Sequence, residues 1–186
     1  MKKIYTILIV LLATVSSLAQ EPLEYSEVIQ AEGRSAEQIY EPLQRWVATS
    51  WKFPSAAKRY EAGNKEIIVD GSFDFVSKGF STSAYSGDVN YSIDIQVRDG
   101  RLKATMSNFR HVRVRSKVNP LGTVYKEDLT KEEYKEGGHG DIFTTRSVYN
   151  GVMKSIREQA EKEWNKIKVQ INAGLTSSVK KEEADW

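Results

Sequence analysis

The chain has 186 residues and no cysteine, and its 27 lysine and arginine residues nearly balance its 25 aspartate and glutamate residues. The lack of cysteine excludes disulfides, thiolate metal sites and cysteine nucleophiles. The charge balance argues against a nucleic-acid-binding domain, which normally carries a clear cationic excess for its phosphate contacts.

The first 19 residues have the layout of a secretory signal peptide. Lys2 and Lys3 give a positive start, an apolar run covers 4–13, and small side chains at Ser17 and Ala19 precede the cleavage point. The apolar run is too short for a membrane-spanning helix, which needs roughly 20 residues. Loss of the two lysines leaves 25 basic against 25 acidic residues. We predict cleavage near Ala19 and a periplasmic or secreted mature protein with no transmembrane segment.

A strand and a helix are predicted at the start of the mature chain. The strand covers 21–31. In the helix, Ser35 and Gln38 fit the capping-box pattern, and apolar residues recur at helical spacing up to Trp51. Pro42 lies past the first turn, where it removes a backbone donor, so we expect a kink there or a start nearer Gln38.

Two hairpins follow, each marked by its turn sequence. Gly63-Asn64 separates the strand segments 58–62 and 65–75, and Asp99-Gly100 lies in the middle of the alternating run 91–108. Because a two-residue turn fixes the register, the second hairpin is predicted to pair apolar residues on one face: Val97 with Leu102, Ile95 with Ala104 and Ile93 with Met106. One face of the sheet therefore packs on helices while the other meets water.

The segment 115–146 is polar and of mixed charge. We predict that it forms an excursion outside the core, with one short helix over 130–135. The glycine-rich stretch 137–141 lacks the Gly-Lys-Ser/Thr ending of a phosphate loop and is interpreted as a turn.

A long C-terminal helix is predicted over 147–173 from an apolar stripe at helical spacing, with a stop at Gly174. The remaining residues, 175–186, are predicted to form a frayed tail. Residues 20–174 thus form a single α+β domain, an antiparallel sheet with helices on one face.

Two stretches carry a resemblance to a known family: Gly33-Arg34-Ser35-Ala36-Glu37-Gln38-Ile39-Tyr40 with Trp46 six residues on, and the hairpin from Tyr91 to Leu102. They resemble an uncharacterised family of exported bacterial domains that is described as having a TATA-binding-protein-like (TBP-like) fold and has no assigned function. The resemblance covers about 25–114 and departs from the usual pattern at Leu102 and Pro42. It implies a curved antiparallel sheet with helices on its convex face. It implies no DNA binding, because a fold does not determine a function.

The residues that carry catalysis in other proteins are sparse. The two histidines, His111 and His139, lie far apart in sequence and make no metal-binding or Ser–His–Asp pattern. We therefore predict no metal, no cofactor and no catalytic residue. Asp70 and Asp74 share one face of a strand, which leaves open the alternative of a hydrolase acting on envelope polymers through paired carboxylates. We favour the interpretation that both aspartates are solvated surface residues.

A ladder of basic residues is the best candidate for a binding site. Arg113, Arg115 and Lys117 alternate along a predicted strand, so they share one face and can receive an anionic group. The other interpretation, which we favour for these three residues, is that they block edge-to-edge pairing of an exposed strand. We interpret the chain as a non-enzymatic binding or interaction module for a cell-envelope ligand or protein partner, with no nucleic-acid partner.

Overall fold

The computed structural model describes the following residues: 20–50, 58–77, 79, 82–114, 118–137 and 144–182. The predicted signal peptide at 1–19, Trp51, which the sequence pattern assigns to the first helix, and His139 lie outside them.

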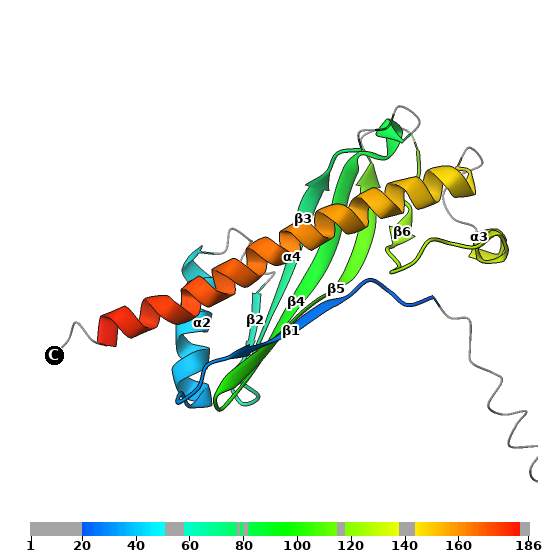
Figure 1. The fold of residues 1–186 in the computed structure, drawn as a ribbon. Helices are drawn as coiled ribbons and strands as arrows, with labels where there is room; N and C mark the ends of the chain where they lie inside the picture. The colour runs from blue at the N-terminus through cyan, green and yellow to red at the C-terminus, as the bar shows by residue number, and fades with distance from the viewer. Residues whose placement is uncertain are drawn as a thin grey trace, which may run out of the picture.

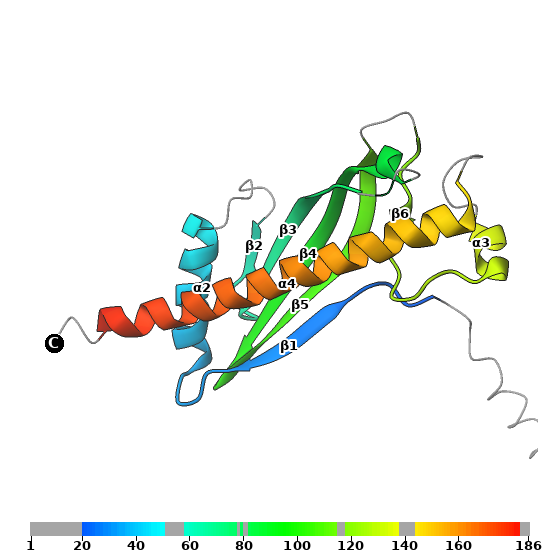
Figure 2. The same cartoon turned by 45° about the horizontal axis from the view of Figure 1, so that its top comes forward.

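The described strands form one antiparallel sheet in the order β1-β5-β4-β3-β2, with β6 also paired to β5. Helix α4 runs along the length of the sheet and α2 lies on the same side (Figure 1), as the turned view confirms (Figure 2). The strands are β1 (Tyr25–Gln30), β2 (Lys58–Glu61), β3 (Glu66–Phe75), β4 (Gly87–Arg98), β5 (Arg101–Val114) and β6 (Gly122–Thr123). The helices are α2 (Ala36–Ser50), α3 (Lys131–Gly137) and α4 (Arg146–Glu182), with a short 3-10 turn, η2 (Ser83–Tyr85). The predicted α+β sheet with helices on one face is confirmed.

The central hairpin β4–β5 has the predicted register. Ile93 pairs with Met106, Ile95 with Ala104 and Val97 with Leu102, and all six side chains are buried. Gly100 has a φ of 71°, the left-handed conformation that this turn requires and that glycine adopts without strain. The turn also holds α2, because the Asp99 carboxylate accepts a 2.7 Å hydrogen bond from the amide of Ala36 at the start of the helix.

Strand β5 contains two irregularities that bend the sheet. Between the pairs Ser92–Ser107 and Asn90–Arg110, β5 has one residue more than β4, and the same happens after Val89–His111. Asn108, inside the first bulge, has a φ of 58°, which asparagine tolerates better than most residues. Such bulges increase local twist and bend a strand.

Helix α2 begins with the predicted capping box: the amide of Gln38 donates to the Ser35 hydroxyl at 3.3 Å, and the Gln38 side chain accepts from the Ser35 amide at 2.9 Å. The helix contains Pro42 and still runs from Ala36 to Ser50. Its apolar stripe, Ile39, Tyr40, Leu43 and Val47, is almost completely buried.

Helix α4 is longer than predicted, since it continues through Gly174 to Glu182. Its first turn is capped by Thr145, whose hydroxyl accepts from the amide of Val148 at 3.3 Å. Gly174 serves close packing rather than termination, because a Cβ atom there would lie 3.2 Å from the ring of Trp46 in α2. The glycine lies inside the helix, where its missing side chain makes room for the ring of Trp46.

The segment predicted to be an excursion at 115–146 contributes side chains to the core, which corrects the sequence-based expectation. Leu121, Val124 and Leu129 are all less than 5% exposed. The segment is hydrogen-bonded to residues 21–23, which precede β1. The amide of Leu23 donates to the Val124 carbonyl at 2.9 Å, and the amide of Lys126 donates to the Glu21 carbonyl at 3.0 Å. The short helix predicted within it is present as α3.

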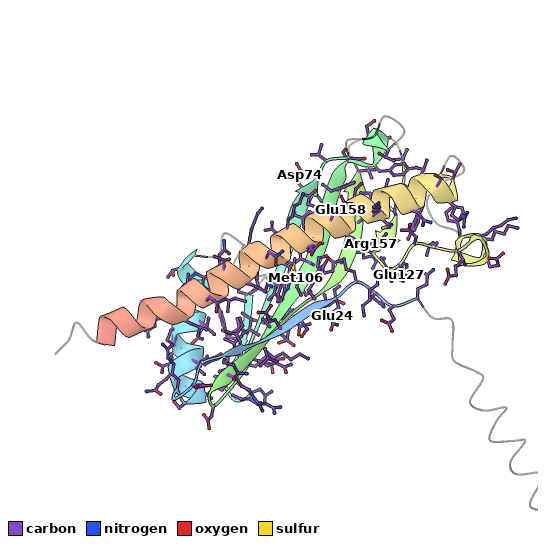
Figure 3. All side chains as sticks on the ribbon, viewed as in Figure 1. Glu24, Asp74, Met106, Glu127, Arg157 and Glu158 are labelled. Carbon is purple, nitrogen blue, oxygen red and sulfur yellow. The ribbon has the colours of Figure 1, made fainter. Side chains whose placement is uncertain are left out.

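Arg157 of α4 fastens this segment from the other side. Its guanidinium donates to the carbonyl oxygens of Tyr125 and Glu127 at 3.3 and 3.5 Å and forms an ion pair with Asp128. Figure 3 shows Arg157 and Glu127 on α4 and on the neighbouring segment. The segment therefore connects residues 21–23, which precede β1, to helix α4.

Candidate functional site

Helices α2 and α4 lie on one side of the sheet (Figure 1). The opposite face carries mostly polar side chains of β3 and β4 and forms the candidate binding surface. Along β3 and β4, every second side chain points to this face, while the residues between them are buried against the helices. A hollow of about 450 Å³ lies at its centre, beside Gly71 and the β5 bulge, and is lined by polar side chains: Asp70, Ser72, Asn90, Ser92 and Asn108.

Asp70 is held as an anion at the rim of this hollow. Its carboxylate forms an ion pair with Arg59 at 2.8 Å and accepts a hydrogen bond from the Ser92 hydroxyl at 2.8 Å. Burial acts to raise the pKa of Asp70, but the hydrogen bonds from Arg59 and Ser92 and the charge of Arg59 together lower the pKa. A carboxyl group in this state is a poor proton donor.

Asp74 lies four residues further along β3, so its Cα is about 13 Å from that of Asp70 at the usual rise per residue. Paired carboxylates in glycosidases lie about 5–10 Å apart on opposite sides of the scissile bond. The two aspartates instead share one strand on an open face, and this arrangement does not make the acid–base pair of a glycosidase.

A second carboxyl pair lies on the same face, near the hairpin tip. The side-chain amide of Gln96 donates to Asp94 at 2.9 Å and to Glu66 at 3.2 Å, and the Asp94 Oδ1 atom is buried without a hydrogen-bond partner. Burial, followed by the neighbouring carboxyl group of Glu66, raises the pKa of Asp94 to about 6.

The raised pKa of Asp94 predicts a stabilising substitution. Between the unfolded pKa of about 3.8 and the folded value of about 6, the folded chain binds more protons, so this group lowers stability as pH rises. Asp94→Asn removes that cost and should raise the free energy of unfolding at pH 7 by about 1–2 kcal/mol. Urea unfolding at pH 7 and pH 4 measures this, and the gain should vanish at pH 4.

Asp70→Asn is the matched control, because it removes a carboxylate whose pKa is lowered by its partners. This variant should lose stability at pH 7. If both substitutions shift the unfolding midpoint in the same direction, the account of the two environments is wrong.

His111 is a structural residue. Its side chain is 1% exposed, its Nδ1 accepts from the amide of Leu121 at 3.1 Å, and its Nε2 lies 3.0 Å from the carbonyl oxygen of Tyr85. This geometry fixes the neutral ring with the proton on Nε2, which donates to Tyr85. Burial lowers the pKa of His111, against the opposing effects of the Tyr85 hydrogen bond and the Asp88 charge. Both ring nitrogens are therefore occupied, and neither is available to a ligand.

The predicted ligand-binding residues Arg113, Arg115 and Lys117 are only partly within the described chain. The backbone of Arg113 lies near the end of β5, opposite Asp88 of β4. Its side chain, and all of Arg115 and Lys117, fall outside the described residues. The binding role of this ladder stays a prediction.

The structure places a different set of cations together, which sequence reasoning missed. Arg98, Arg101 and Lys103 line a second hollow, of about 310 Å³, at the tip of the central hairpin. The signal was present in the sequence, because the register set by Asp99-Gly100 puts Arg98 directly opposite Arg101.

An antiparallel sheet with α2 and α4 on one face and polar side chains on the other is an α+β domain with one open sheet face. Residues 25–112 match the model of a family described as "Domain of unknown function (DUF4468) with TBP-like fold". The resemblance seen in the sequence is thus confirmed.

Two solved structures are similar to the chain. One is a TBP-like protein from Parabacteroides distasonis ATCC 8503, with a TM-score of 0.52 and 12% sequence identity over 81% of this chain and 93% of that one. The other is a DUF4468 family protein from Bacteroides ovatus ATCC 8483, with a TM-score of 0.46 and 15% identity over 84% and 91%. The first likeness supports the fold alone. No curated protein matches the sequence. Within the described part of the chain, none of the helices is long and apolar enough to span a membrane.

Proposed function

We propose that this protein is a non-enzymatic binding module, exported by cleavage near Ala19, that presents the open face of its sheet to an anionic ligand or partner of the cell envelope. One observation carries the proposal: a broad polar sheet face, with two hollows, lies opposite the helices. Polar groups already oriented by a rigid sheet can bind a ligand at low entropic cost.

The carboxylates of the open face support binding over hydrolysis. Asp70 is kept ionised by Arg59 and Ser92, and Asp74 is a neighbour on the same strand rather than a partner across a cleft. The hydrolase alternative requires one protonated and one ionised carboxyl group facing each other across the substrate. A nucleic-acid partner is disfavoured because a long polyanion would also cover the acidic side chains Glu66, Asp70 and Asp94, which would repel its phosphates. A small anion can instead bind at the cations of the hairpin tip without covering that acidic stretch.

The full chain is first expressed in a Gram-negative host, and the intact mass of the purified protein should show that residues 1–19 have been removed. The test of binding is then retention of this mature chain, residues 20–186, on envelope fractions of the host. We expect retention that weakens steeply with added salt, because exposed charges are screened beyond about 8–10 Å at physiological ionic strength. Retention that ignores salt, or no retention at all, would contradict the proposal.

The role of the basic ladder is tested in the same assay. Replacing Arg113, Arg115 and Lys117 together by glutamine should abolish retention while changing the free energy of unfolding by only about half a kcal/mol. If the triple variant aggregates while retention is unchanged, the ladder protects the strand from pairing and binds nothing.

A further inference from the structure

Three cations gather at the tip of the central hairpin. Arg98 and Arg101 are directly opposite each other in the ladder, and Lys103 lies two residues further along β5, opposite Gln96. Like charges directly opposite each other on neighbouring strands destabilise a sheet. Within the described residues, the ion pairs of the structure involve neither arginine.

The acidic groups nearby do not neutralise this pair. Asp99 lies in the turn between the two arginines, but its carboxylate is turned to the amide of Ala36, at 2.7 Å, where it caps α2. Asp94 lies diagonally across the strand pair from Lys103, whose charge acts to lower the pKa of Asp94 against the larger effect of burial. Lys103 is thus partly compensated by Asp94. Glu66 lies beside Gln96, at 3.2 Å from its side-chain amide, and among the described residues neither Glu66 nor any other acid forms an ion pair with Arg98 or Arg101.

The tip is also a rigid place for a site. The amide of Gly100 donates to the carbonyl of Arg34 at 2.8 Å, and the amide of Ala31 donates to the carbonyl of Gly100 at 2.8 Å. The turn is therefore fixed between β1 and α2. The hollow beside it, about 310 Å³, is bounded by the three cations, Gln96, Leu102 and Val28, the last of these 50% exposed. The fixed turn holds the backbones of the two arginines in place, so only their side chains have to be ordered when a ligand binds.

We propose that Arg98 and Arg101, assisted by Lys103, form a binding site for a phosphate monoester. The charge decides between anions: a phosphate monoester carries about −1.5 to −2 at pH 7 and offers three acceptor oxygens, which matches two arginines. A carboxylate or a phosphodiester carries a single negative charge and would leave one arginine uncompensated. Guanidinium groups bind such oxygens through two parallel hydrogen bonds. The proposal rests on the proposed function, in that it takes the open sheet face to be the binding surface.

The experiment is a titration of the mature chain, followed by backbone amide NMR shifts, with inorganic phosphate, glucose 6-phosphate, dimethyl phosphate and acetate at constant ionic strength. We expect the two monoester-type anions to shift amides 97–104 in a saturable manner and the two monoanions to bind at least about tenfold more weakly. Equal effects of all four anions, or shifts spread evenly over the molecule, would overturn the proposal.

Variants complete the test. The double change Arg98→Gln and Arg101→Gln should weaken phosphate binding by about tenfold or more, while Arg45→Gln, which removes an exposed cation of α2, should leave it unchanged. The double variant removes a repulsive pair, so its thermal midpoint should equal or exceed that of the wild type in buffer without phosphate. Unchanged phosphate affinity in the folded double variant would overturn the proposal.

A vesicle-binding experiment distinguishes a phosphate monoester on a lipid headgroup from one on a soluble ligand. Vesicles of phosphatidylcholine with phosphatidic acid, which carries a monoester headgroup, should retain the wild type if the group is presented on a lipid, and binding of glucose 6-phosphate alone supports a soluble ligand. Binding to neither refutes the proposal. The envelope-retention assay is independent: if Arg98→Gln and Arg101→Gln leave retention intact and phosphate does not bind, this inference fails while the proposed function stands.

Discussion

Replacement of Ile95 by aspartate is expected to unfold the domain or to bring it close to unfolding. Ile95 has no exposed surface and lies at the centre of the sheet, opposite Ile67 of β3 and Ala104 of β5. An aspartate there is either a buried charge without a partner or a neutral acid without a hydrogen bond. We expect a loss of several kcal/mol, out of a total of about 5–15 kcal/mol for a typical domain. Urea unfolding followed by circular dichroism measures the loss.

The preceding residue provides the control. Asp94 lies on the same strand but on the open face, so Asp94→Ala should unfold at the same urea concentration as the wild type or a higher one. If Ile95→Asp and Asp94→Ala unfold alike, the assignment of the two faces is wrong.

The second large effect is expected at His111. The variant His111→Phe keeps a ring in the core but leaves the carbonyl of Tyr85 and the amide of Leu121 without partners. Each buried group left unpaired costs about 1–3 kcal/mol, so we expect a loss of about 2–5 kcal/mol in the free energy of unfolding. The loss should appear as a lower urea midpoint with an unchanged slope.

The difference in the free energy of unfolding between the wild type and His111→Phe should depend on pH, in the direction set by the lowered pKa of His111. Because burial lowers the folded pKa of His111, the unfolded chain binds the proton first as pH falls below about 6.5. The histidine's contribution to stability is therefore complete above pH 7 and declines below about 6.5. The wild type should lose its advantage over His111→Phe as pH falls from 7 to 5. An advantage that grows on acidification would refute the assignment of a neutral buried ring.

The parts of the fold that were predicted correctly depend on local signals. The Asp99-Gly100 turn fixes its own register through the geometry of a two-residue turn, and Ser35 with Gln38 specifies a helix start within four residues. Neither signal depends on distant residues. The sheet and its covering helices follow from the period of the apolar positions, which is also a local property.

The parts that failed depend on distant partners. Leu121, Val124 and Leu129 are buried beside partners that are distant in the sequence. The carbonyl of Val124 accepts from the amide of Leu23, the amide of Leu121 donates to His111, and the amide of Leu129 donates to Asn150. The local sequence predicts a helix stop at Gly174, because the packing of this glycine against Trp46 of α2 cannot be inferred from neighbouring residues.

The sequence analysis did not find the site at Arg98 and Arg101 for a related reason. The ladder of Arg113, Arg115 and Lys117 follows from period two along one strand. The convergence of Arg98 and Arg101 appears only when two strands are paired in register. The Asp99-Gly100 turn places Arg98 opposite Arg101, and this pairing follows from the turn geometry once the hairpin is formed.

The pairing of the chain start with residues 124–126 has a consequence for the order in which the domain is assembled. A chain that is synthesised or exported from its amino terminus delivers β1 first, but the partner of β1 is the 101–106 part of β5, and residues 21–23 wait for 124–126. The central hairpin, whose strands are joined by a short turn, needs no such wait and can form within microseconds. The earliest segment to emerge is therefore among the last to be incorporated. Until then, its apolar residues Leu23 and Ile29 stay uncovered, and aggregation is a risk during that interval.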